Sequence, residues 1–124
     1  MIKLTFCLRR LPRLSRAEFQ RYWSETHGPL VRRHAKALCI ARYVQVHTLD
    51  DVFNDALKAS RGGLDAYDGV AEIWWRSRGD LEATLSTAEA QDAARALLED
   101  ERRFIDLEHS ALWIGEEKVV IRDA

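Results

Sequence analysis

Residues 70–76 read VAEIWWR, and this stretch says most about the fold. Successive side chains of a strand point to opposite faces of a sheet, so the adjacent Trp74 and Trp75 must lie on different faces. Each indole can bury about 200 Å². At about 25 cal/mol per Å², leaving either ring in water would lose several kcal/mol. The stretch therefore predicts a strand that is covered on both sides.

Working outward from this strand, three more segments show strand patterns. Residues 2–8 and residues 40–48 both alternate with a period of two. A last strand is expected from near His109 past Gly115, with Gly115 as a candidate for a bulge or bend. The polar residues 49–66 predict a connecting loop with one helical turn around residues 52–58.

Two longer segments have the spacing of helices. The first is expected to begin at a capping box formed by Ser15 and Glu18, and an aromatic stripe follows it. Gly28 and Pro29 predict an interruption before a second helical stretch. The later helix is expected to begin at a second capping box, residues 86–89, and to end near residue 104.

The order strand, helix, strand, strand, helix, strand predicts an α+β fold of the ferredoxin-like βαββαβ type. Its four-stranded antiparallel sheet would carry both helices on one face. Because no further element remains to cover the second indole, the sequence predicts a homodimer whose two open sheet faces pack together. The alternative is a tryptophan near a sheet edge that stays partly exposed.

Length and composition limit the classes of protein that fit. The chain has 124 residues, which predicts a single domain over residues 1–124. It is 47% hydrophobic with a net charge of −1, so neither nucleic acid nor an anionic membrane is expected as a partner. No apolar run reaches the roughly 20 residues of a membrane span. The basic residues follow the apolar start instead of preceding it, which predicts a cytoplasmic protein.

Several segments resemble the EthD family, a branch of the dimeric α+β barrel proteins. The most specific are FQRYW at residues 19–23 and HGPLV at residues 27–31, supported by LRRLP at 8–12, DGVAEIWW at 68–75 and DERRFID at 100–106. The resemblance implies a cofactor-independent protein with a small-molecule pocket in each protomer, in catabolic or secondary metabolism. Similar relatives act as lactone isomerases, polyketide dehydratases or cyclases, and quinol-type monooxygenases, so the family does not select one reaction.

His27 is the best candidate for chemistry. It stands at the end of the first helix, where a histidine with a pKa near neutral suits proton transfer. The alternative is a helix cap that satisfies main-chain carbonyls. The four histidines are dispersed without metal-ligand spacing, so no metal is expected. The resemblance implies that no other cofactor is bound.

Aromatic and polar side chains predict walls for a small hydrophobic or aromatic ligand. Trp23, Tyr43 and Trp74 would form the aromatic walls, and His47 lies on the same strand face as Tyr43. A solvent-facing strand end is the alternative for His47.

Two carboxylates stand at positions where apolar residues are expected. Glu72, between apolar neighbours on its strand face, is a candidate general acid or base, or the partner of Lys3 or Arg9 in an ion pair. Glu101 falls on the apolar stripe of the later helix and needs a partner, for which Arg42 or another basic strand residue could serve.

The residues leave two hypotheses for function open. One is a small cofactor-independent enzyme, in which His27 moves a proton during isomerisation, dehydration or cyclisation of a carbonyl-bearing or aromatic metabolite. The other is a non-catalytic protein that carries or senses a hydrophobic metabolite in the same pocket. A quinol-type or haem-handling monooxygenase is a third option.

Overall fold

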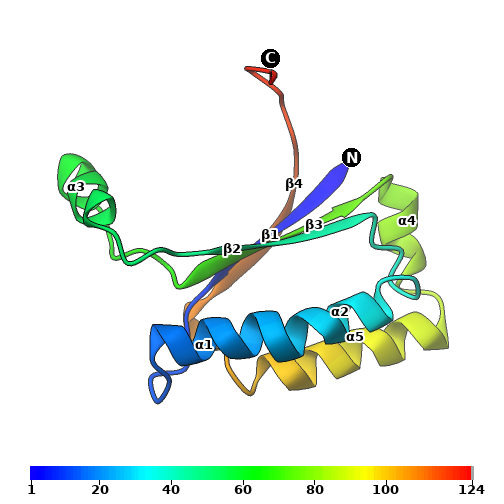
Figure 1. Ribbon diagram of the computed structural model, residues 1–124. Helices are drawn as coiled ribbons and strands as arrows, with labels where there is room; N and C mark the ends of the chain where they lie inside the picture. Colours follow the sequence, from blue (N-terminus) through cyan, green and yellow to red (C-terminus); the bar gives the residue numbers. More distant parts are fainter. Residues whose placement is uncertain (124) are drawn as a thin grey trace.

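The computed structural model describes residues 1–123 and has a four-stranded antiparallel sheet with a layer of helices on one face (Figure 1). The strands are β1 (Ile2–Leu8), β2 (Arg42–His47), β3 (Gly69–Trp75) and β4 (Ala111–Glu116), in the order β2-β3-β1-β4. The helices are α1 (Arg16–Tyr22), α2 (Gly28–His34), α3 (Val52–Arg61), α4 (Arg78–Ala83) and α5 (Ala88–Glu101). This arrangement confirms the predicted ferredoxin-like α+β fold.

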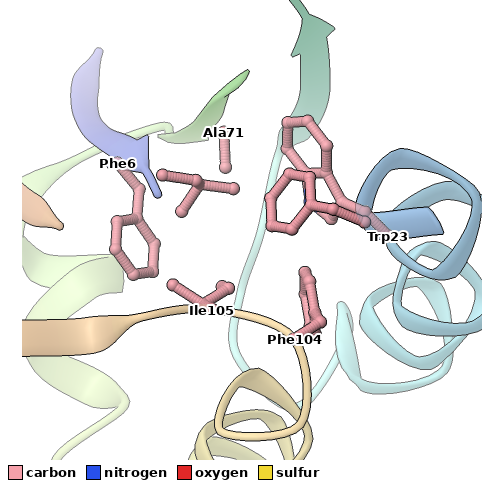
Figure 2. Close-up of a cluster of buried hydrophobic side chains, with 7 residues drawn as sticks. Phe6, Trp23, Ala71, Phe104 and Ile105 are labelled. Atoms are coloured by element: carbon pink, nitrogen blue, oxygen red, sulfur yellow. The ribbon is translucent and has the colours of Figure 1, made fainter. Parts of the chain in front are cut away.

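The main core lies between the sheet and the helix layer (Figure 2). Phe19, Trp23 and Phe104 are almost completely buried there, and Phe6 of β1 packs against them. The Phe19 ring forms tilted pairs with Trp23 and Phe104, at centroid distances of 5.7 and 5.4 Å. Trp23 can lie against β3 because position 69 is glycine: a Cβ there would come within 2.4 Å of the indole.

The first helical region is continuous, so the predicted interruption at Gly28 and Pro29 is wrong. The capping box is confirmed: Ser15 Oγ accepts the Glu18 N–H, and the Glu18 carboxylate accepts the Ser15 N–H. Between α1 and α2, residues Trp23–His27 form a π-helical turn that the Gly28 N–H closes on the Trp23 carbonyl. Pro29 then falls in the first turn of α2, the part of a helix in which proline is best tolerated.

Three other local features differ from the sequence prediction: a helix cap, a predicted bulge and the length of a helix. The cap of α5 is Thr87, one residue after the predicted Ser86, and its hydroxyl accepts the Ala90 N–H. Gly115 makes no bulge, because it pairs with Lys3 in the regular register of β4. The loop over residues 49–66 contains a ten-residue helix, α3, instead of a single turn.

The open face of the sheet corrects one premise of the predicted homodimer. Trp74 lies on this face, yet only 8% of it is exposed in the single chain. The side chains of Lys3 and Arg42 each lie over its ring at 4.8 Å, and its Nε1 donates to Glu117. The chain therefore covers this indole itself, with the cationic groups of two charged side chains. Trp113, on the same face, remains 52% exposed.

Candidate functional site

His27 lies in the π-helical turn and is 5% exposed. Its Nδ1 is 2.8 Å from Oδ2 of Asp100, a buried carboxylate on α5. The Phe104 ring packs against the imidazole at a centroid distance of 5.0 Å. Short π-helical turns often occur at functional sites, because the wider turn displaces side chains from their usual helical directions. The pair joins two helices that are 73 residues apart in the sequence.

The Asp100 carboxylate makes hydrogen bonds with three side chains of this site. Tyr22 Oη donates to its Oδ1 at 2.5 Å, and Arg103 Nη1 donates to the same oxygen at 3.0 Å. Burial alone would raise the pKa of Asp100, but the hydrogen bonds from Tyr22, His27 and Arg103 outweigh burial and hold this pKa below its usual value. The carboxylate is therefore ionised at neutral pH.

Burial controls the protonation of His27 as well. It lowers the pKa of the imidazole, and the opposing effect of Asp100 does not fully cancel this decrease. A neutral His27 beside an ionised carboxylate carries its proton on Nδ1, which donates to Asp100. Nε2 is then a proton acceptor, and it makes no hydrogen bond with any residue in the range 1–123. This arrangement can accept a proton and stabilise the resulting imidazolium.

A second polar group stands on β2, next to the π-helical turn. His47 Nε2 is 2.8 Å from Oε1 of Gln45, whose Nε2 donates to Tyr43 Oη at 3.0 Å and to the Trp23 carbonyl at 2.9 Å. The His47 ring stacks on Trp23 at a centroid distance of 4.4 Å. Burial lowers the pKa of His47. Three of the predicted binding residues, Trp23, Tyr43 and His47, are thus brought together.

A pocket of about 470 Å³ opens between α2 and the first half of β2. Polar and apolar surface line it about equally, and Arg32, Arg42, Tyr43 and Gln45 supply the larger polar groups. Its volume is in the range of small-ligand sites. His27 and Trp23 are not among its lining residues, although their neighbours Ser24 and Gly28 are. The lining residues are Ser24, Gly28, Pro29, Val31, Arg32, Ala35, Ile40, Ala41, Arg42, Tyr43 and Gln45.

Glu101 has a different environment from the one expected. The predicted ion pair with Arg42 is wrong, since Arg42 lies over Trp74 on the other side of the sheet. Burial and then the neighbouring Asp100 charge raise the pKa of Glu101 to about 7. Burial and, as a smaller cause, the Glu101 charge also raise the pKa of Tyr43. Glu101 forms no ion pair within residues 1–123, so it can exchange a proton near neutral pH.

Glu72 and Trp74 do not join this site. Their register on β3 places them on the open face, whereas Tyr43 and His47 of β2 lie on the helix-covered face. Glu72 forms an ion pair with Lys3, which is the alternative that the sequence left open. The six predicted site residues therefore fall into two groups that the sheet separates.

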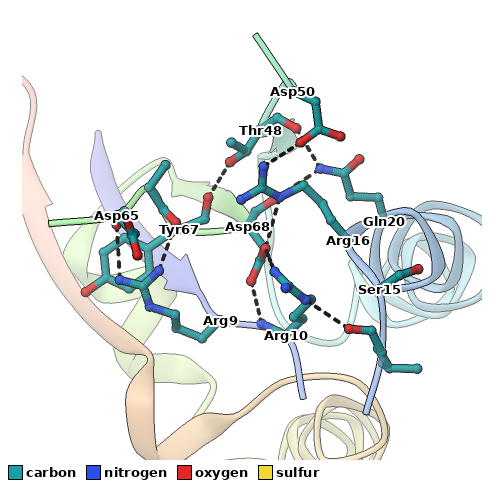
Figure 3. A network of polar contacts seen from close by, with 12 residues as sticks. Arg9, Arg10, Ser15, Arg16, Gln20, Thr48, Asp50, Asp65, Tyr67 and Asp68 are labelled. Carbon is teal, nitrogen blue, oxygen red and sulfur yellow. Dashed lines mark hydrogen bonds and ion pairs between the residues drawn. The ribbon is translucent and has the colours of Figure 1, made fainter. Parts of the chain in front are cut away.

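Asp68, immediately before β3, centres a polar network that the sequence analysis did not identify (Figure 3). Its carboxylate accepts the Arg10 N–H at 2.8 Å, Arg10 Nη1 at 2.6 Å and Arg16 Nε at 3.0 Å. Burial would raise its pKa, but these donors hold the pKa of Asp68 below its usual value. A pocket of about 700 Å³ lies beside it. Each basic side chain of that pocket already donates within the chain, so this region is a structural network.

Two kinds of site are absent from the part of the chain that the structure describes. Among residues 1–123, no three or more His, Cys, Asp or Glu side chains are grouped closely enough to hold a metal ion. Within the same range, no helix has the length and apolar character needed to span a bilayer.

The chain belongs to the EthD family, because residues 11–108 match the EthD domain. No curated protein sequence matches it significantly. Three solved structures show the same fold. An EthD family protein from Bacillus halodurans C-125 has 21% identity and a TM-score of 0.61, with 95% of this chain and 99% of that chain covered. A dimeric protein of unknown function with a ferredoxin-like fold, from Bacteroides fragilis NCTC 9343, has 9% identity and a TM-score of 0.57, with 94% and 95% covered.

The third structure is a variant of SnoaB from Streptomyces nogalater, a cofactor-independent oxygenase. It has 16% identity to this chain and a TM-score of 0.50, with 98% of each chain covered. At these identities the three structures establish the fold and not a shared activity.

Proposed function

We propose that this protein is a small cofactor-independent enzyme that moves a proton on a hydrophobic or aromatic carbonyl metabolite. The observation that carries the proposal is the buried pair of His27 and Asp100, 2.8 Å apart, with Nε2 free of other partners within residues 1–123. Isomerisation, dehydration and cyclisation are the reaction types that such a pair serves. Membership of the EthD family is consistent with this class of protein.

In this mechanism His27 Nε2 takes a proton from the carbon next to a substrate carbonyl, and the bond electrons move into the carbonyl to give an enolate. Asp100 keeps the imidazole in the reactive tautomer and stabilises its cationic form. Tyr22 and Arg103 fix the carboxylate so that it does not rotate. The imidazolium then returns the proton to a new position on the substrate, or to a leaving hydroxyl group.

The pocket between α2 and β2 supports the proposed ligand class. Its apolar side chains suit a hydrophobic ring, and Tyr43 Oη, which accepts from Gln45, can donate its own hydrogen to a carbonyl or hydroxyl group. Glu101, with its pKa raised to about 7, carries a second proton that exchanges near neutral pH, although it does not line the pocket. Trp23 and His47 stack on each other and contact Gln45 through the Trp23 carbonyl and His47 Nε2, but neither side chain lines the pocket itself.

Hydrogen–deuterium exchange on a model ketone tests the mechanism. Wild-type protein in D₂O with 1-tetralone should accelerate exchange of the protons next to the carbonyl, as followed by ¹H NMR. His27→Gln should reduce the catalysed exchange by about 100-fold, the lower part of the range for a general base. His109→Gln is a matched control, because His109 forms the same 2.8 Å contact with Asp106 but is exposed. Full exchange activity in His27→Gln would exclude His27 as the base.

The alternative function is a non-catalytic carrier or sensor of a hydrophobic metabolite. The pocket beside Tyr43 favours it, because this pocket does not include His27. Binding of aromatic ketones that quenches tryptophan fluorescence, without exchange of their protons, would support this alternative over the enzyme.

We also propose that two chains form a homodimer through the open face of the sheet. On that face Trp113 is 52% exposed and Val46 is 48% exposed. Packing of a second sheet on this face would bury both side chains. The similar Bacteroides fragilis protein is dimeric. Sedimentation of the wild-type chain tests this part of the proposal.

A further inference from the structure

Helix α3 presents a row of large apolar side chains to solvent. Val52, Phe53 and Leu57 are 79%, 72% and 55% exposed, and no residue of the helix is buried. Leu49 and Leu64, on the segments at either end, are 69% and 85% exposed. Contiguous exposed apolar groups of this kind mark a surface that binds something.

A helix of this length needs packing to be stable. Ten residues are too few for an isolated helix to persist in water, and most helical stability in proteins comes from burial of an apolar face. Asp51 caps the start of α3 by accepting the Phe53 N–H, and Gly62, at a φ of 60°, ends it. The sequence therefore determines where α3 begins and ends. Its apolar face, however, packs against nothing within residues 1–123 that buries it.

The position of α3 indicates on which side of the sheet a partner that buries its apolar face would lie. Figure 1 shows α3 beyond the end of β2, on the side of the sheet away from the helix layer. The segment after β4 extends to the same side, and its Val119, Val120 and Ile121 are 64–90% exposed. The open face between them exposes Val46 and Trp113.

The combined apolar area is what a stable dimer requires. These exposed side chains can each lose about 60–100 Å² of apolar surface on burial, which amounts to roughly 600–1,000 Å² per chain. A standard protein interface buries about 800 Å² per partner. A second copy offers the same surfaces, as a self-complementary two-fold contact needs. The ten side chains are Val46, Leu49, Val52, Phe53, Leu57, Leu64, Trp113, Val119, Val120 and Ile121.

The charges of α3 favour a protein partner over a membrane. Helices that lie on membranes have polar faces rich in Lys and Arg. The polar residues of α3 include Asp55 as well as Lys58 and Arg61, and Asp50 and Asp51 precede the helix. Such a mixed surface gives no net attraction to anionic lipid.

We propose that α3 is a dimer clasp whose apolar face packs on a second copy of this chain, seated on the open face of the sheet. The proposal rests on the homodimer proposed above and adds a specific contact to it. In this dimer the side chains of residues 46 and 113 are buried near the centre of the interface. Helix α3, beyond the end of β2, contacts the partner at the edge of the interface.

Sedimentation equilibrium on four variants tests the clasp. Phe53→Glu and Leu57→Glu should each raise the dimer dissociation constant by about 10- to 100-fold, because a buried apolar side chain is replaced by a charge. Leu85→Glu is the matched control: Leu85 is 75% exposed on the connection between α4 and α5, away from the open face. Trp113→Glu should also dissociate the dimer, and it reports on the open face independently of α3.

Each outcome separates the clasp from the dimer itself. A wild-type chain that stays monomeric overturns both proposals. A dimer that Trp113→Glu dissociates, but that Phe53→Glu and Leu57→Glu weaken no more than the control does, overturns only the clasp. Hydrogen exchange on the wild type adds a test without substitution: amides 52–61 should be protected in the dimer and lose this protection on dilution. Flotation of the wild type with phosphatidylserine vesicles that requires Phe53, with an unchanged dimer, would assign α3 to a membrane instead.

Discussion

The two faces of the sheet bury adjacent tryptophans by different means. Trp75 lies on the helix-covered face, where its Nε1 donates to the Leu38 carbonyl at 2.8 Å and 5% of it is exposed. Trp74 lies on the open face and is 8% exposed, but the groups over it are the side chains of Lys3 and Arg42. Nearly equal burial thus arises from close packing on one face and from flexible charged side chains on the other.

The two faces also differ in the environments of their titratable side chains. The helix-covered face excludes water and holds groups with shifted pKa values, such as His27, Asp100 and Glu101. The open face pairs its charges directly, as between Lys3 and Glu72. Burial beneath the helix layer is the largest cause of the shifts at His27 and Glu101.

Replacing each tryptophan of the pair by alanine should show the largest contrast. Trp75→Ala should lower the free energy of unfolding by about 3–5 kcal/mol, because the packed helices cannot fill the cavity. Trp74→Ala should cost about 1–2 kcal/mol, because Lys3 and Arg42 can collapse onto the gap or return to water. Urea unfolding at two protein concentrations measures both losses, and equal losses would contradict the contrast.

Alanine substitutions at two glycines extend the comparison, with smaller expected losses of unfolding free energy. Gly69→Ala on β3 should lose about 2–3 kcal/mol, since the new Cβ would lie 2.4 Å from the Trp23 ring and 3.0 Å from the Val46 carbonyl. Gly115→Ala on β4 is the control, with no atom within 4 Å of the new Cβ, and should stay within about 0.5 kcal/mol of the wild type. The same urea titrations detect the difference, and a stable Gly69→Ala variant would show that Trp23 moves freely.

The raised pKa of Glu101 predicts a pH-dependent loss of stability. Between its ordinary value of 4.5 and about 7, the folded chain binds this proton more strongly than the unfolded chain does, so stability falls as pH rises. Glu101→Gln should remove this fall and gain up to about 2 kcal/mol relative to the wild type between pH 5 and pH 8. Thermal unfolding at both pH values tests this. An unchanged difference between the two proteins would mean that Glu101 stays ionised throughout.

The sequence analysis succeeded where local patterns decide the structure. Alternation in residues 70–76 gave the correct strand and the opposite directions of the two tryptophans. The capping box at Ser15 identified the start of α1, because its hydrogen bonds involve residues three apart. The prediction failed at Gly28 and Pro29, since a π-helical turn absorbs the proline without ending the helix.

The candidate site was predicted less well, because its contacts are remote in the sequence. His27 was singled out, but Asp100 was not, and nothing local connects residues 73 positions apart. Glu72 was proposed for the site because apolar residues flank it on its strand face, and Trp74 because its ring suits a pocket wall. The strand register places them across the sheet from His27.

From the order of its residues alone, this chain's four strands, the two helical regions that cover the sheet and the βαββαβ topology can be derived, because alternation, helical spacing and caps act over a few neighbouring residues. Folding of the whole chain decides which buried carboxylate meets His27, how Trp74 is covered and why α3 is left bare. Those features depend on which distant side chains share a low-dielectric space, and no short stretch of sequence contains that information.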